Sequence, residues 1–290
     1  MALVAVGGYG RRELCPASDL DVVLVHRGGA TAGVVKSVAE QIWYPVWDAG
    51  VGLDHSVRTV KEALSVAGTD LKAALGLLDA RLVAGDEALA ADLAERARAQ
   101  WRKAAHRWLP ALAEAVAARH SQFGEVAFLL EPELKEGRGG LRDVAALRAA
   151  ALATPVVDGS GPMVSAAYET LLEVRVELHR RAGRVLDRLL LQEQDGVAAA
   201  LGSADADALM AAVAAAGRTI AWASDDAWRR VTSARAGPKG RTTGRDRPLS
   251  AGLALRDGEI VLSGSADPGG DPSLVLRAAA AAAELGALVA

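Results

Sequence analysis

The feature that most constrains this chain is a glycine-rich turn that lies between two apolar segments and is followed by a pair of carboxylates. Residues 7–10, Gly-Gly-Tyr-Gly, follow an apolar segment at 2–6, and Asp19 and Asp21 open a second one at 19–26. Both apolar segments have the composition of short buried strands. Side chains two positions apart on a strand point to the same face, so the two carboxylates are expected to project together.

This order of residues favours phosphate and metal chemistry. Carboxylate oxygens suit Mg²⁺, which usually also binds oxygens of a substrate phosphate. Two such ions about 4 Å apart can stabilise the attacking and leaving oxygens of a phosphoryl displacement. Glycines allow a close backbone approach to the phosphates. No Gly-Lys-Ser/Thr follows, which argues against a Walker loop. The alternative is a tight turn beside two solvated aspartates.

Three further stretches accompany the first motif. They are His-Ser-Val-Arg-Thr at 55–59, Ala-Arg-Leu-Val-Ala-Gly-Asp at 80–86, which is expected to close a helix, and Glu-Pro-Glu-Leu-Lys-Glu-Gly-Arg-Gly-Gly-Leu-Arg-Asp at 131–143. The first motif resembles the signature of the polymerase-β-like nucleotidyltransferase superfamily. Together, the four stretches resemble the N-terminal half of the bacterial PII signal-protein uridylyltransferases, and the resemblance covers nearly the whole chain.

The resemblance implies Mg²⁺-dependent transfer of UMP from UTP to a tyrosine of the PII nitrogen-regulatory protein. Asp19 and Asp21 would then be catalytic and bind the metal, with Asp54 on the expected strand 53–57 as the candidate third acid. Asp54 could equally be a surface acid at a strand end. Its neighbour His55 is either a phosphate or base contact or, as most lone histidines are, structural. Two alternatives remain: adenylyl transfer from ATP to PII or another protein, and a catalytically silent nucleotide-binding regulatory module.

Nucleotide contacts are expected from both glycine-containing stretches. Three glycines within residues 137–140 make a poor helix and suit a loop that approaches phosphate. Cations in and next to this loop would balance the triphosphate charge, although a surface loop closed by a salt bridge is the alternative. The residues expected to contact the nucleotide are Gly7, Gly8, Arg11, Ser18, Lys135 and Arg142.

The pattern along the chain predicts an α+β protein with four parts. These are a nucleotidyltransferase α/β domain at 1–86, a helical-bundle domain at 87–235 with a glycine-rich loop at 131–143, a linker at 236–248, and a hairpin with a terminal helix at 249–290. Leucine and alanine at helical spacing predict helices near 87–119, 143–153, 164–193 and 205–234. The Gly-, Arg-, Thr- and Pro-rich composition of 236–248 predicts a mobile linker. Asp257-Gly258 favours a type I′ hairpin turn, and Asp271-Pro272 a helix start.

Composition limits the partners. The 290 residues carry a net charge of −3, and the pI is about 6.0, which argues against a nucleic-acid-binding protein. Cys15 is the single cysteine, so an intrachain disulfide is excluded. There is no secretory signal and no apolar run of membrane-spanning length, which predicts a cytoplasmic protein. The expected partners are UTP or ATP and PII. The five histidines are scattered and none precedes an aspartate, so no metal-hydrolase cluster is expected.

Overall fold

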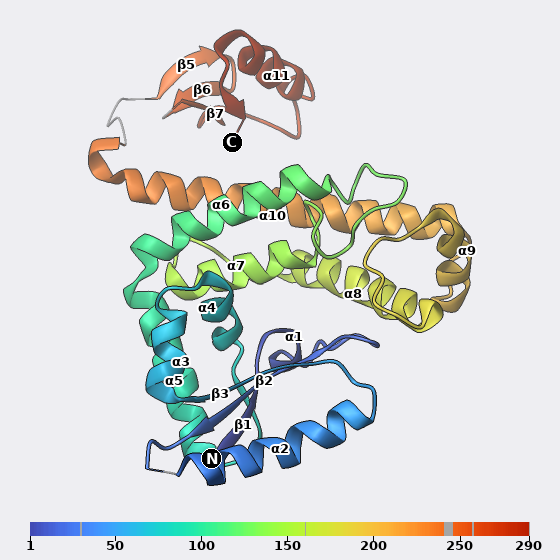
Figure 1. The fold of residues 1–290 in the computed structure, drawn as a ribbon. Helices are drawn as coiled ribbons and strands as arrows, with labels where there is room; N and C mark the ends of the chain where they lie inside the picture. The colour runs from blue at the N-terminus through green and yellow to red at the C-terminus, as the bar shows by residue number, and fades with distance from the viewer. Residues whose placement is uncertain (30, 160, 241–245, 257, 290) are drawn as a thin grey trace. The chain divides into compact units, whose positions relative to one another are not determined.

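The computed structural model describes residues 1–29, 31–159, 161–240, 246–256 and 258–289. It divides the chain into two compact units, residues 1–231 and 232–290. Helices and small sheets occur in both units, so the prediction of an α+β chain is confirmed (Figure 1). None of the helices among the described residues has the length and apolar character that crossing a bilayer requires.

A four-stranded mixed sheet forms the start of the first unit. Its strands are β1 (Ala2–Ala5), β2 (Leu20–His26), β3 (Leu53–Thr59) and β4 (Arg81–Gly85), in the order β3-β2-β1-β4. β1 is antiparallel to both of its neighbours, whereas β2 and β3 are parallel. A parallel pair needs a crossover, which α2 (Ala32–Asp48) provides.

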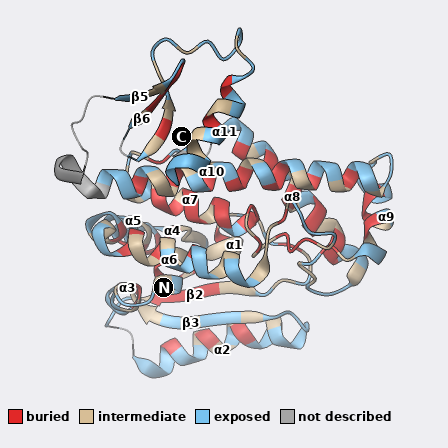
Figure 2. Cartoon of the chain, turned by 90° about the horizontal axis from the view of Figure 1, so that it is seen from above, coloured by how far each residue is buried: buried red, intermediate tan, exposed pale blue. Residues whose placement is uncertain are grey.

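The two faces of this sheet are covered by different helices (Figures 1 and 2). Val22 and Leu24 of β2 pack against α2, and Val23 and Val25 face the opposite side. This alternation follows from the two-residue period of a strand. The helices on the second face are α3 (Val60–Ala67), α4 (Leu71–Leu78) and α5 (Glu87–Lys103).

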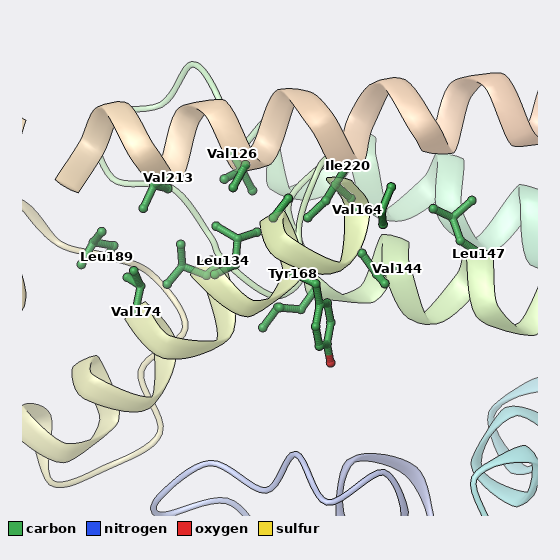
Figure 3. Close-up of a cluster of buried hydrophobic side chains, with 14 of the residues drawn as sticks. Val126, Leu134, Val144, Leu147, Val164, Tyr168, Val174, Leu189, Val213 and Ile220 are labelled. Carbon is green, nitrogen blue, oxygen red and sulfur yellow. The ribbon is translucent and has the colours of Figure 1, made fainter. Parts of the chain in front are cut away.

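The rest of the first unit, here called the helical segment, runs from α6 to α10 and has its own core. Its helices are α6 (Ala105–Phe123), α7 (Leu141–Ala153), α8 (Pro162–Ala182), α9 (Leu191–Ala200) and α10 (Ala206–Gly240). Leu134, Leu171, Leu189 and Ile220 are fully buried in this core. Figure 3 shows that the cluster gathers side chains from several of these helices and from the loop that precedes α7.

Several boundaries differ from those expected. Residues 81–85 form strand β4 on β1 rather than the end of a helix. The helix expected over 164–193 stops at Ala182, because Gly183 adopts a left-handed conformation with φ 63° that ends a helix. The chain then resumes helical structure in α9.

Among its described residues, the second unit contains the last residues of α10, a sheet and one further helix. Strands β5 (Arg247–Ser250), β6 (Leu253–Arg256), β7 (Glu259–Leu262) and β8 (Leu288–Val289) are ordered β5-β6-β7-β8, and the helix is α11 (Leu274–Leu285). The β6–β7 hairpin is confirmed, but residue 257 of its turn lies outside the described residues. α11 begins at Leu274, three residues after Asp271, whose carboxylate instead accepts a hydrogen bond from the Ser273 backbone.

The linker expected at 236–248 stays a prediction. α10 extends to Gly240, and β5 begins at Arg247. Residues 241–245 lie outside the described residues.

Candidate active site

The two aspartates of the first motif lie at the start of β2, between two backbone contacts. The Val6 amide donates to the Asp21 carbonyl at 3.0 Å, which fixes the glycine turn (residues 7–10) on the β1 side. The Leu20 amide donates to the Gly52 carbonyl at 2.8 Å, which fixes Gly52 on the β3 side. Asp21 shares its sheet face with Val23, the face turned to α3, α4 and α5.

Charge accumulates around Asp21. Asp54 is its register partner on β3. Burial raises the pKa of Asp21, and the negative charges of Asp54 and Asp19 raise it further. Lys72 of α4 and Lys135 of the loop before α7 act in the opposite direction. Residues from four separate stretches of the chain therefore contribute to one electrostatic site, in which three carboxylates repel one another and two lysines oppose that repulsion.

Two glycines lie next to the aspartates. A Cβ on Gly52 would lie 1.9 Å from Oδ1 of Asp19, so any other residue there would displace this carboxylate. Gly7 has φ +55°, and its Cβ position lies 3.6 Å from Oδ2 of Asp21. Sequence reasoning included Gly7 but missed Gly52, although its position just before the third strand was visible in the sequence.

The donor chemistry of the aspartate pair fits a divalent cation, because a cation would offset the repulsion that raises the pKa of Asp21. Among the residues that the structure describes, no three or more His, Cys, Asp or Glu side chains are grouped so that they could hold a metal ion. A cation at Asp19 and Asp21 would therefore take its remaining oxygens from a bound phosphate or from water, as Mg²⁺ commonly does.

Arg11 and the acids around it join the glycine turn to α4. Its guanidinium contacts Asp79, the residue after α4, at 2.5 Å, and Glu13 at 2.6 Å. Arg81 of β4 donates to the carbonyls of Gly10 and Tyr9 at 3.0 and 2.8 Å. These contacts fix the end of the turn, and they give the guanidinium of Arg11 two carboxylate partners.

Glu13 connects this region to the helical segment. Besides Arg11, its carboxylate accepts hydrogen bonds from Arg148 of α7 at 3.0 Å and from Tyr168 of α8 at 2.5 Å. In Figure 3 the Tyr168 hydroxyl points out of the apolar cluster, toward the N-terminal part of the chain. Burial and the bond to Glu13 raise the pKa of Tyr168 to about 12, so it stays a hydrogen-bond donor.

The site loop, residues 11–18, leads into Asp19 and is held by side chains of α8. Arg175 Nη1 lies 2.7 Å from the Cys15 sulfur, and His179 Nδ1 lies 2.6 Å from the Pro16 carbonyl oxygen. Asp187 joins both side chains, at 2.7 Å from Arg175 Nε and 2.9 Å from His179 Nε2.

The loop next to Asp19 is also conformationally restricted. Ala17 has φ +61° and Arg12 has φ +65°, a left-handed conformation that is uncommon for residues other than glycine. Ser18 completes the loop, with its amide 3.2 Å from the Cys15 carbonyl oxygen. Sequence reasoning missed the support from α8, because these residues lie more than 150 positions from the loop and follow no periodic pattern.

The glycines of the loop at 131–143 are explained by close packing. A Cβ on Gly139, which has φ +82°, would lie 2.3 Å from the Gly217 carbonyl oxygen of α10. A Cβ on Gly137 would lie 2.6 Å from the Glu133 carbonyl oxygen. The fully buried Asp143 accepts from the Gly139 amide at 2.7 Å and from Arg119 at 2.5 Å.

The two cations predicted from this stretch have different surroundings. Lys135 lies 3.6 Å from Asp187, which follows α8, and its charge also acts on Asp21. The guanidinium of Arg142 pairs with Glu136 at 3.1 Å, and its side chain is 53% exposed. His55 lies on the other face of the sheet, with its ring 4.9 Å from that of Trp43 and 5.4 Å from that of Trp47.

Glu133 gives this loop a pH-dependent stability. The residue is buried, and burial raises its pKa from 4.5 to about 6. The folded protein therefore holds a proton there that the unfolded chain has released, and stability from this group is lost as the pH rises from 4.5 to about 6. We expect Glu133→Gln, which keeps an acceptor for the Gly137 amide, to remove this loss. The urea midpoints of both proteins across that pH range measure the loss of stability. Parallel pH profiles of the two proteins would contradict the prediction.

A glycine-rich turn beside paired carboxylates, with two lysines that reach them from outside the sheet, suits a protein that binds phosphate together with a divalent cation. A family model described as GlnD PII-uridylyltransferase matches residues 107–160 and 156–226. Together with the relatives described next, this match shows that the chain belongs to the GlnD PII-uridylyltransferase family.

Curated relatives match along almost the entire chain. A protein of Streptomyces coelicolor named bifunctional uridylyltransferase/uridylyl-removing enzyme is 50% identical over 99% of this chain. Proteins of the same name from Mycobacterium tuberculosis and Corynebacterium glutamicum are 46% and 39% identical, over 98% and 100% of the chain. The chain spans 36%, 36% and 41% of the length of these three relatives.

Proposed function

We propose that this chain transfers UMP from UTP to a tyrosine of the PII protein. In this proposal the region around the first sheet is a polymerase-β-like nucleotidyltransferase domain, the helical segment is the bundle that accompanies it, and the protein acts in the cytoplasm. The observation that carries the proposal is the position of Asp21, which is paired in register with Asp54, lies next to Gly7 of the glycine turn, and is acted on by the charges of Asp19, Lys72 and Lys135. Family membership supports uridylyl transfer as the reaction.

Each part of the site has a distinct role in this proposal. The first amides of the short helix α1 (Gly7–Gly10) have no acceptor within the helix and would bind the β- and γ-phosphates. Asp19 and Asp21 would hold Mg²⁺, which when bound neutralises phosphate charge and orients the reacting oxygens. Lys72 and Lys135 would contribute further positive charge. The tyrosine oxygen would attack the α-phosphorus and pyrophosphate would leave, with positioning and charge supplying most of the rate.

The proposal is tested by incubating the chain with PII, Mg²⁺ and either UTP or ATP, and measuring the intact mass of PII. We expect addition of UMP with UTP only. Addition of AMP would instead establish adenylyl transfer. Nucleotide binding without modification of PII or another protein would indicate the regulatory module.

The different surroundings of Lys135 and Arg142 allow their roles to be separated. We expect Lys135→Ala to weaken binding of the Mg²⁺-nucleotide about tenfold, as loss of one charge-assisted contact should. Arg142→Ala is expected to weaken binding as well, but by less, because the Arg142 side chain is 53% exposed and paired with Glu136. Calorimetric titration measures both affinities, and thermal unfolding is the control. A variant with unchanged affinity and a lowered melting temperature would show that the residue it replaces is structural.

A further expectation concerns removal of the nucleotide. Hydrolytic removal requires a water activated by a ligand cluster, and no such cluster occurs among the described residues. We therefore expect these 290 residues to release no UMP from modified PII when pyrophosphate is absent, with or without glutamine. Rapid release with Mg²⁺ or Mn²⁺ would reveal a hydrolytic site elsewhere in the chain.

A further inference from the structure

We propose that a pocket beside Asp19 receives the acceptor side chain, a phenol presented on a loop of the partner protein. This inference rests on the proposed function and adds the place of the acceptor to it. The pocket has a volume of about 590 Å³ and is lined by residues 14–18 and 50–52 and by Val176 and Arg180 of α8. Ser18 and Leu20, the neighbours of Asp19 in sequence, both line it.

The pocket lies on the side of the aspartates from which the attacking oxygen would approach. In phosphoryl transfer the attacking and leaving oxygens lie roughly in line on opposite sides of the phosphorus. The glycine turn, which would hold the departing pyrophosphate, lies on the β1 side of β2. Gly52, in the pocket wall, lies on the β3 side. With the α-phosphate at the aspartates between them, an acceptor in this pocket approaches from the side opposite the leaving group.

The lining fits an aromatic acceptor better than a nucleoside. Pro16, Val51 and Val176 give the pocket apolar walls. Ser18 contributes a hydroxyl group and Arg180 a positive charge. A ribose with its base carries many polar groups that need partners, whereas a phenol ring needs apolar walls and one polar end. The pocket is also larger than one aromatic side chain, which leaves room for the flanking residues of a loop. Arg180, whose side chain is 66% exposed, gives the entrance a positive charge suited to an acidic residue on that loop.

The wall formed by the site loop is already fixed in place. Cys15 and Pro16 are held by Arg175 and His179 of α8, the helix that also contributes Val176 and Arg180. Ala17 keeps its left-handed φ of +61° next to these contacts, and such a conformation persists only where the surroundings enforce it. A preformed pocket lowers the cost of ordering the acceptor when it binds.

The chemical step is balanced in this arrangement. The phenolic oxygen forms a bond to the α-phosphorus as the bond from that phosphorus to the oxygen bridging to the β-phosphate breaks. The bridging oxygen leaves with the electron pair as part of pyrophosphate, on the side of the glycine turn. The phenolic proton passes to water.

The test fills the pocket without touching the aspartates. Val176→Trp is expected to raise the KM for PII or lower its modification at least about tenfold, as overpacking excludes the ring. The dissociation constant of Mg²⁺-UTP should change less than about twofold, a difference within about 0.4 kcal/mol. Met163→Trp is the control, because Met163 lies on the same helix, is 72% exposed and does not line the pocket.

A second variant guards against a folding defect. Arg180→Glu changes an exposed side chain at the entrance, whose guanidinium lies 3.7 Å from Glu177, and should raise the KM for PII while leaving affinity for UTP unchanged. If Val176→Trp weakens UTP binding in parallel with transfer, the pocket holds the nucleoside and the inference is wrong. If both variants modify PII as fast as the wild type, the pocket is not used. A wild-type chain that modifies no acceptor would contradict the proposed function itself.

Discussion

Replacing Asp21 by Asn is expected to lower nucleotide transfer at least about a hundredfold, a loss of ~2.7 kcal/mol of transition-state stabilisation, without unfolding the protein. The amide keeps the shape of the side chain but removes the charge that would hold the cation. Stability should be unchanged or slightly higher, because burial and the charges of Asp54 and Asp19 already raise the pKa of Asp21. A neutral side chain relieves this repulsion.

The measurement compares transfer rates and melting temperatures with those of Asp48→Asn, a matched change at an exposed position at the end of α2. That control should behave as the wild type in both assays. Asp54→Asn distinguishes a third metal carboxylate from a surface acid, since only the former should lose activity to a similar degree. A folded Asp21→Asn protein that keeps more than about a tenth of the activity, a deficit below ~1.4 kcal/mol, would contradict the metal assignment.

The parts of the fold that the sequence predicted are those set by local rules. Apolar runs with glycine between them marked β1 and β2, a strand was expected at 53–57, where β3 lies, and the two-residue period placed Asp21 on the face opposite Val22. The same period, applied to β3, puts His55 on the other face from Asp54, next to α2. β4 was missed because its pairing with β1 spans almost eighty residues and leaves no periodic signal in a five-residue segment.

The rest of the site depends on contacts distant in sequence. Lys72 was not identified, because one lysine at the start of an amphipathic helix resembles any solvated residue. Tyr168 and His179 meet the site loop only once α8 is packed against it. Such contacts belong to tertiary structure, so the sequence showed where the carboxylates lie but not which side chains support them.

The glycines of the loop at 131–143 illustrate a different limit. Their spacing suggested a phosphate-approaching loop, but in the structure their small size allows backbones to meet. The contact between Gly139 and Gly217 is the clearest case, since neither residue has a side chain to separate the loop from α10. Composition alone could not distinguish these two reasons for glycine, because both require a close backbone approach.

Gly139→Ala is accordingly expected to be the most destabilising single substitution in this loop, by at least about 3 kcal/mol. Two costs combine at this position. Its φ of +82° is unfavourable for alanine, and the new Cβ would lie 2.3 Å from the Gly217 carbonyl oxygen. Gly183→Ala is the matched control, because Gly183 has φ +63° but no atom within 4 Å of the Cβ position. The free energy of unfolding of the Gly183→Ala protein should fall only by the cost of the backbone conformation, about 1–2 kcal/mol.

Urea unfolding of the two variants and the wild type measures both losses, and an unchanged m-value supports a direct comparison. The difference between the variants isolates the steric contact with α10 from the shared conformational cost. Equal losses would mean that the loop shifts to accommodate the methyl group. Because Lys135 is four residues before Gly139, such a shift would also move its ammonium relative to Asp21. In that case the Gly139→Ala protein should bind Mg²⁺-UTP more weakly, whereas a purely steric destabilisation leaves the affinity of the folded fraction unchanged.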